Sequence, residues 1–101
     1  MDEAIAARSP NGPTAPFDPT ARYRLDPDVA LRPEPFGALA YHYGSRRLTF
    51  LRSALLAEVV RDLESHDSVD AALTASVPEA ERPAYRRALA SLADSRFIRA
   101  C

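Results

Sequence analysis

The chain has 101 residues, of which 47% are apolar and 27% are charged, and its formal net charge is −1. A chain of this size forms at most one domain, and this charge excludes a protein whose overall field draws it to nucleic acid or membranes. Cys101 is the only cysteine, so no internal disulfide can form, and the sequence shows neither a signal peptide nor a long apolar run. We therefore expect a cytoplasmic protein.

The first part of the sequence has the composition of an unstructured segment. Residues 9–20 include four prolines and one glycine, and they show neither helical nor strand periodicity. We expect residues 1–22 to be a disordered N-terminal arm and residues 23–101 to be the folded domain. The arm is either a plain tail or a segment that becomes ordered on a partner.

Two short strand signals come next, at residues 23–25 and 29–32, on either side of the turn sequence Asp26-Pro27-Asp28. Pro33 and Pro35 follow directly, and neither can donate a hydrogen bond to a neighbouring strand. This part of the chain is therefore expected at the edge of a sheet or in a connection.

The clearest element is a β-hairpin. Its strands are predicted at residues 38–43 and 46–51, because both runs are rich in aromatic and aliphatic residues. Gly44-Ser45 between them suits a two-residue loop, with glycine at the first central position of a type II′ turn.

The pairing that this loop imposes divides the hairpin into two unlike faces. One face carries four large apolar side chains that we expect in the core: Leu39, Tyr41, Leu48 and Phe50. The other face is small and mostly polar, with a partly solvated histidine, and it consists of Ala38, Ala40, His42, Arg47, Thr49 and Leu51. Such a hairpin requires a second layer on its apolar face.

The rest of the sequence has helical periodicity. Apolar spacing predicts an amphipathic helix over residues 52–64, a short helix over 69–75 and a third helix over 83–94, with a proline near its first turn. Phe97 and Ile98 are expected to close the chain against the core. The fold class is therefore α+β, a three-stranded antiparallel sheet packed on a three-helix, winged-helix-like bundle.

No group of residues has the spacing of a catalytic or metal site. His42 and His66 lie on different elements, and Cys101 is distant from both, so no metal-binding pattern is present. The three glycines do not form a phosphate loop, and no serine has the context of a nucleophile. We therefore expect a protein that is not an enzyme and needs no cofactor.

The run from Ala30 to Leu51, ALRPEPFGALAYHYGSRRLTFL, resembles the small peptide chaperones of mycofactocin biosynthesis. These belong to the wider PqqD-like RiPP recognition elements, which bind the precursor peptides of ribosomally made natural products. The resemblance is close over residues 23–51 and looser through the helices. It implies three strands followed by three helices, with the peptide added along the third strand, in a groove between that strand and the third helix. It also implies delivery of the peptide to a radical SAM maturase, which holds the iron–sulfur cluster and SAM.

The residues support strand addition to the hairpin on physical grounds. The last strand of a three-stranded meander is a free edge, and residues 46–51 contain no proline, so unpaired backbone groups are expected there, including the N–H of Thr49. Tyr85 and Leu89 either line the groove or belong to the core. The candidate peptide-binding residues are Arg46, Arg47, Leu48, Thr49, Phe50, Leu51, Tyr85, Arg86 and Leu89.

Two other functions fit parts of the sequence. A winged-helix DNA-binding regulator would need a basic recognition helix, whereas residues 83–94 carry Arg86 and Arg87 together with Asp94. An enzyme would need a set of catalytic residues that the sequence lacks. The expected partners are therefore a precursor peptide and a radical SAM maturase, and neither nucleic acid nor a membrane. We expect a monomer, with a homodimer through exposed strand edges as the alternative.

Overall fold

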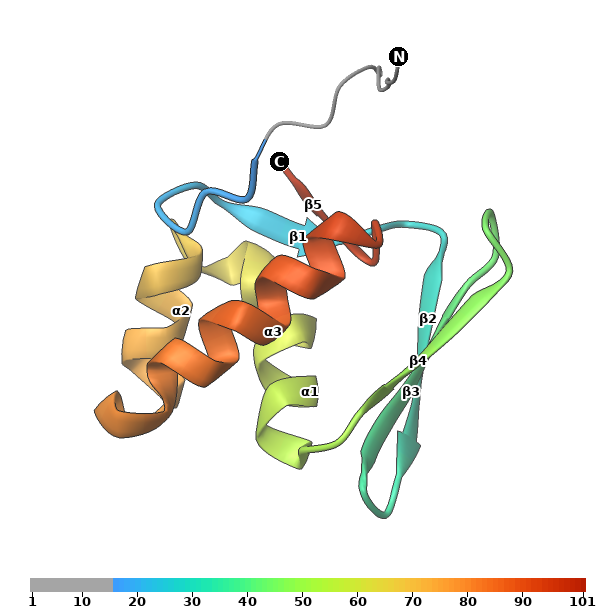
Figure 1. Cartoon of the computed structure of the whole chain (residues 1–101), viewed down its shortest axis with the longest axis horizontal. Helices are drawn as coiled ribbons and strands as arrows, with labels where there is room; N and C mark the ends of the chain where they lie inside the picture. The colour runs from blue at the N-terminus through green and yellow to red at the C-terminus, as the bar shows by residue number, and fades with distance from the viewer. Residues whose placement is uncertain (1–15) are drawn as a thin grey trace.

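A computed structural model describes residues 16–101 (Figure 1). Its elements in chain order are β1 (Tyr23–Leu25), β2 (Val29–Glu34), β3 (Gly37–His42), β4 (Arg47–Leu51), α1 (Ala54–Asp62), α2 (Val69–Ser76), α3 (Arg82–Asp94) and β5 (Ile98–Ala100). Short 3-10 turns at Leu63–Ser65 and Glu79–Glu81 connect the helices. The predicted fold class is confirmed, because three helices lie to one side and a three-stranded antiparallel sheet to the other.

The structure contains two sheets. Strands β2, β3 and β4 form an antiparallel meander with β3 in the centre, and β1 pairs with β5 in a separate two-stranded sheet. Leu25 lies opposite Ile98, and the Cys101 N–H donates to the Arg22 carbonyl at 3.0 Å. The last strand therefore joins the C-terminal end of the chain to the first strand, which was not predicted.

The hairpin loop differs from the predicted one, although the strand register is as expected. Four residues, Tyr43 to Arg46, connect β3 to β4, and the Arg46 N–H donates to the His42 carbonyl at 2.7 Å. Arg46 has a positive φ of 60°, whereas Gly44 does not have a positive φ. The type II′ prediction is therefore wrong. The register survives because both loops place Leu48 in the same pairing position.

The backbone pairing also shows which groups of β4 are free. Tyr43 lies opposite Asp28 beyond the paired residues of β2 and β3, and its N–H donates to the Asp28 carbonyl at 2.9 Å. Bonding direction alternates along an antiparallel strand, so odd-numbered residues of β3 bond to β2 and even-numbered residues bond to β4. Ala40 therefore bonds to its partner Thr49. The expectation that the Thr49 N–H is free is wrong, because it points into the sheet.

The two faces of the hairpin are the reverse of the prediction. The small face packs against the helices: Ala38, Ala40, His42 and Leu51 are all buried. The large apolar face points away from them, with Leu48 and Phe50 58% and 56% exposed. Alanines allow α1 to approach β3 closely, which explains why the small side chains lie inside.

The helices begin and end near the predicted positions. Ser53 caps α1 by accepting a hydrogen bond from the Leu56 N–H, and Ser68 caps α2 by accepting one from the Ala71 N–H. Pro83 lies in the first turn of α3, where its missing N–H costs nothing.

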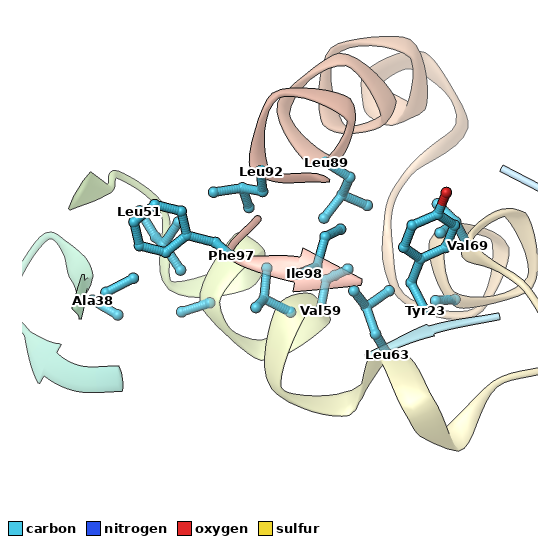
Figure 2. Packing of buried hydrophobic residues seen from close by; sticks show 14 of the residues in the cluster. Tyr23, Ala38, Leu51, Val59, Leu63, Val69, Leu89, Leu92, Phe97 and Ile98 are labelled. Atoms are coloured by element: carbon cyan, nitrogen blue, oxygen red, sulfur yellow. The ribbon is translucent and has the colours of Figure 1, made fainter. Parts of the chain in front are cut away.

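One core joins the helices and both sheets. In Figure 2, Leu89 projects from α3 toward Ile98 of β5 and Leu92 toward Phe97, with Val59 and Leu63 below them. Phe97 and Ile98 are both buried, as predicted.

The segment before β1 contacts this core. The Phe17 and Tyr23 rings lie 5.1 Å apart, and the Ala21 carbonyl accepts a hydrogen bond from the Val69 N–H at the start of α2. Residues 1–15 of the predicted arm lie outside the described residues. The division of the chain between residues 22 and 23 stays a prediction.

Candidate functional site: an open strand edge and the exposed face beside it

The outer edge of β4 is an unpaired strand edge. Leu48 and Phe50 alternate with the inward-bonding residues, so their N–H and C=O groups point away from β3. Within residues 16–101, no backbone group forms a hydrogen bond with the outward N–H or C=O of Leu48 or Phe50. Their side chains are also exposed, so a second chain can reach both the backbone and the side chains of this strand.

The opposite edge of the sheet is less suited to pairing. By the same alternation, Pro33 of β2 faces outward, and it has no N–H to offer. Pro35 follows in the turn before β3. The prediction that this part of the chain lies at a sheet edge or in a connection is confirmed, with Pro33 at the edge and Pro35 in the connection. On the β2 edge the Val29 N–H already donates to the Asp26 carbonyl at 2.9 Å, so Leu31 is the one residue between Val29 and Pro33 whose outward N–H is free within the described part of the chain. The two edges therefore differ in chemistry, and the β4 edge presents two successive free N–H groups, those of Leu48 and Phe50.

The side of β4 that faces the helices is anchored by one hydrogen bond. The Tyr85 hydroxyl of α3 lies 2.9 Å from the Ser53 hydroxyl, just after β4. Ser53 Oγ also accepts the capping hydrogen bond from the Leu56 N–H at 3.1 Å. Tyr85 is therefore half-buried at the junction of β4, α1 and α3.

The structure separates the predicted site residues into exposed and buried ones. Arg46, Arg47, Leu48 and Phe50 are exposed, and Thr49 and Tyr85 are half-buried. Leu51 and Leu89 are buried in the core, so neither offers a surface to a ligand in this structure. Arg86 points to α2, where its Nη2 lies 3.0 Å from Asp70 Oδ1.

The outward face of the sheet and its loops carry two pairs of aromatic residues, of which Phe36, Tyr43 and Phe50 are exposed and Tyr41 is half-buried. The Phe36 and Phe50 rings lie edge to face with centroids 5.6 Å apart, and Tyr41 and Tyr43 form a similar pair at 5.0 Å. The Arg52 guanidinium lies 5.9 Å from the centre of the Phe50 ring. Phe36, Phe50 and Arg52 line an open cavity of about 330 Å³, which we call the outer cavity.

Sequence reasoning missed Phe36, Tyr43 and Arg52 and placed the exposed face inside. One signal was available. Ala38 and Ala40 share a face, and close packing lets a helix approach a strand most nearly where the side chains between them are small. Large apolar residues on the other face then have nothing to cover them, and exposed apolar patches mark binding surfaces.

His42 has a structural position and does not lie in the exposed site. The side chain is buried rather than partly solvated as expected. Its Nδ1 accepts a hydrogen bond from the Ser45 N–H at 3.2 Å, and its ring lies edge to face against Phe97, with centroids 5.7 Å apart. Its Nε2 lies 3.9 Å from Asp26 Oδ1. His42 therefore links the hairpin loop to the core.

The described part of the chain has neither a cluster of metal-binding side chains nor a helix that could span a membrane. Among residues 16–101, no three His, Cys, Asp or Glu side chains gather in a group that could hold a metal ion. In the same range, no helix has the length and apolar character needed to cross a membrane.

Comparison with known proteins places the chain in a family. No solved structure gives a significant match. Three curated proteins named "Peptide chaperone MftB" do match. The protein of Mycobacterium ulcerans is 46% identical over 83 residues, covering 81% of this chain and 76% of that protein. The protein of Mycolicibacterium smegmatis is 43% identical over 83 residues, covering 81% of each chain. The protein of Mycobacterium tuberculosis is 39% identical over 93 residues, covering 91% of this chain and 85% of that protein. The sequence model of the Peptide chaperone MftB family matches residues 22–99, and the chain therefore belongs to this family.

Proposed function

We propose that this protein is a chaperone for a precursor peptide of mycofactocin biosynthesis. The peptide binds as an additional strand along β4, and the loaded chaperone delivers it to a radical SAM maturase. The observation that carries this proposal is the open edge of β4, with the backbone groups of Leu48 and Phe50 directed outward beside exposed apolar side chains. Strand addition draws affinity from such backbone groups and specificity from alternate side chains.

The family supports the peptide as the partner. The three matching relatives are named peptide chaperones, and the match includes all of the sheet and the three helices. A chaperone that must release its peptide to an enzyme needs an accessible binding surface. An edge strand meets this need, because the peptide can pair with it without any opening of the core.

The side chains on the two faces of the bound peptide strand would contact different residues of the protein. Successive side chains of a strand point to opposite faces. One set would lie on the helix side, near Thr49 and Tyr85, and the other set on the outward side, near Leu48 and Phe50. Tyr85 would form the rim on the helix side, whereas Leu89 would support the site from the core.

The protein is proposed to act without catalysing a reaction itself. The maturase would supply the chemistry, together with the iron–sulfur cluster and SAM. The role of this chain is then to hold the peptide in an extended conformation, which lowers the entropic cost of positioning it in the enzyme.

The DNA-binding alternative is not favoured by the contacts of α3. A recognition helix needs basic side chains that are free to reach DNA. Arg82 donates to the Val77 carbonyl at 2.8 Å, and Arg86 bonds to Asp70. Two of the three arginines between Arg82 and Arg87 are thus engaged within the helical layer.

The experiment is calorimetric titration of the cognate precursor peptide into the wild-type protein and into Leu48→Pro. The proline removes one outward N–H and places its ring where the peptide backbone must approach. We expect the Kd to rise by about tenfold or more, because a backbone hydrogen bond is lost and the strands are pushed apart. Circular dichroism and the unfolding midpoint should stay near the wild-type values, because proline is tolerated at an edge.

Two control variants separate the backbone from other effects. Leu48→Ala keeps the N–H and should bind more tightly than Leu48→Pro. Thr49→Pro removes an N–H that bonds to β3, and it should lower stability. Wild-type affinity in folded Leu48→Pro would rule out strand addition at this edge.

A further inference from the structure

We propose that the outer cavity of Phe36, Phe50 and Arg52 selects the bound peptide by its side chains. It would accept an apolar side chain and, two residues away along the peptide, a carboxylate. This inference rests on the proposed function, since it requires the peptide to be a strand on β4. It adds a recognition site on the outward face of the sheet, away from α3.

The position of the cavity follows from the pairing geometry. A residue of the added strand that lies opposite Phe50 would share its outward face, with Cβ atoms about 4.5–5.5 Å apart. Phe36 reaches the same place from the turn between β2 and β3, since its ring packs against that of Phe50. The peptide side chain opposite Phe50 would therefore lie over the mouth of the outer cavity.

The chemistry of the cavity favours an apolar side chain at this position. Phe36 and Phe50 are 43% and 56% exposed, so covering them removes apolar surface from water. Their edge-to-face arrangement leaves part of each ring open to a further aromatic or aliphatic group.

A carboxylate two residues from that apolar side chain could form an ion pair with Arg52. Arg52 follows β4 on the same outward face, two residues after Phe50, so the peptide residue two positions from the apolar one would lie beside it. Arg32, also on this face, already bonds to Glu34 at 2.6 Å. Arg52, by contrast, forms no ion pair with any residue in 16–101.

The charge distribution agrees with an acidic peptide segment. Residues 32–52 contain four arginines and one glutamate, a net charge of +3, so the remaining residues sum to −4 when the whole chain is −1. A second copy of the protein, docked through its outward face, would bring Arg32 and Arg52 of the two copies together. The repulsion between them disfavours self-association through this face and favours an acidic ligand.

The test uses fluorescence anisotropy with the labelled cognate precursor peptide and two variants outside the strand edge. Phe36→Ala truncates one wall of the cavity without altering β4, and we expect the Kd to rise about threefold to tenfold. Arg52→Glu reverses the cation, and we expect a similar rise that shrinks at high salt. A glutamate before Ser53 is compatible with the N-terminus of α1, so this variant should fold.

Arg61→Glu is the matched control, because Arg61 is an exposed arginine in the last turn of α1. It should bind the peptide as the wild type does. Alanine substitution of each acidic peptide residue should identify one whose loss has no further effect on Arg52→Glu. An unchanged Kd in both Phe36→Ala and Arg52→Glu, with weakened binding in Leu48→Pro, would overturn the cavity and leave strand addition intact. Unchanged binding in all three variants would overturn both.

Discussion

At the scale of single residues, Gly37 decides how closely the end of β4 passes the start of β3. Its φ is +146°, a conformation that side chains rarely adopt. A Cβ atom on this residue would lie 2.1 Å from the Leu51 carbonyl oxygen and 2.8 Å from the Ser53 nitrogen. The backbone contact that leads from the sheet into α1 therefore requires glycine.

We expect Gly37→Ala to lower the free energy of unfolding by about 3 kcal/mol, from backbone strain and steric overlap together. Gly44→Ala is the control. Its Cβ atom would lie 3.1 Å from His42 Cε1, without a positive φ, and so it should cost far less. Urea unfolding of both variants measures the difference. Equal stability of the two would mean that the chain shifts easily at Gly37.

At the scale of elements, the sequence predicted the two strands of the hairpin and their register, but not which face of the hairpin is buried. Alternation fixes which residues share a face, and so Leu39 was correctly paired with Phe50. Which face is buried depends on what packs against it. The helices pack on Ala38 and Ala40 because small side chains let the layers approach, and the alternation of apolar residues alone does not indicate this face. The same limit explains the site: the strand edge was foreseen, whereas the outer cavity was not.

Ser53 connects the end of β4 to α1 and α3, so its substitution should lower stability more than the loss of one helix cap. Ser53→Ala removes the cap of α1 and the partner of the Tyr85 hydroxyl. We expect a loss of about 1–3 kcal/mol, compared with about 1 kcal/mol for Ser68→Ala, which removes only the cap of α2.

A double-mutant cycle in chemical denaturation tests the coupling. Tyr85→Phe should lower stability in the wild-type background and have little effect in Ser53→Ala. Additive effects would show that the two hydroxyls do not stabilise one another. Peptide titration of Tyr85→Phe then reports on the helix-side rim alone.

At the scale of the whole molecule, the C-terminal strand closes the fold onto its beginning (Figure 1). Three residues of β5 are too short for a reliable strand signal, and their partner lies at the other end of the sequence. The burial of Phe97 and Ile98 was predictable from their apolar character, but the pairing with β1 was not. This pairing places Phe97 between the two sheets, with its carbonyl accepting from the Asp26 N–H and its ring against His42.

The molecule thus has a buried phenylalanine, Phe97, and an exposed one, Phe50. Substitution by alanine should mainly lower stability at the first and mainly weaken peptide binding at the second. Phe97→Ala opens a cavity in the core, and we expect it to cost about 3–5 kcal/mol, a large share of the stability of a small domain. Phe50→Ala removes an exposed ring and should change stability by only about 0.5 kcal/mol, while weakening peptide binding. Unfolding curves and peptide titrations of both variants test the separation. If Phe50→Ala unfolds as easily as Phe97→Ala, the outward face belongs to the folding core; if it stays stable and loses affinity, that face is held exposed for a ligand.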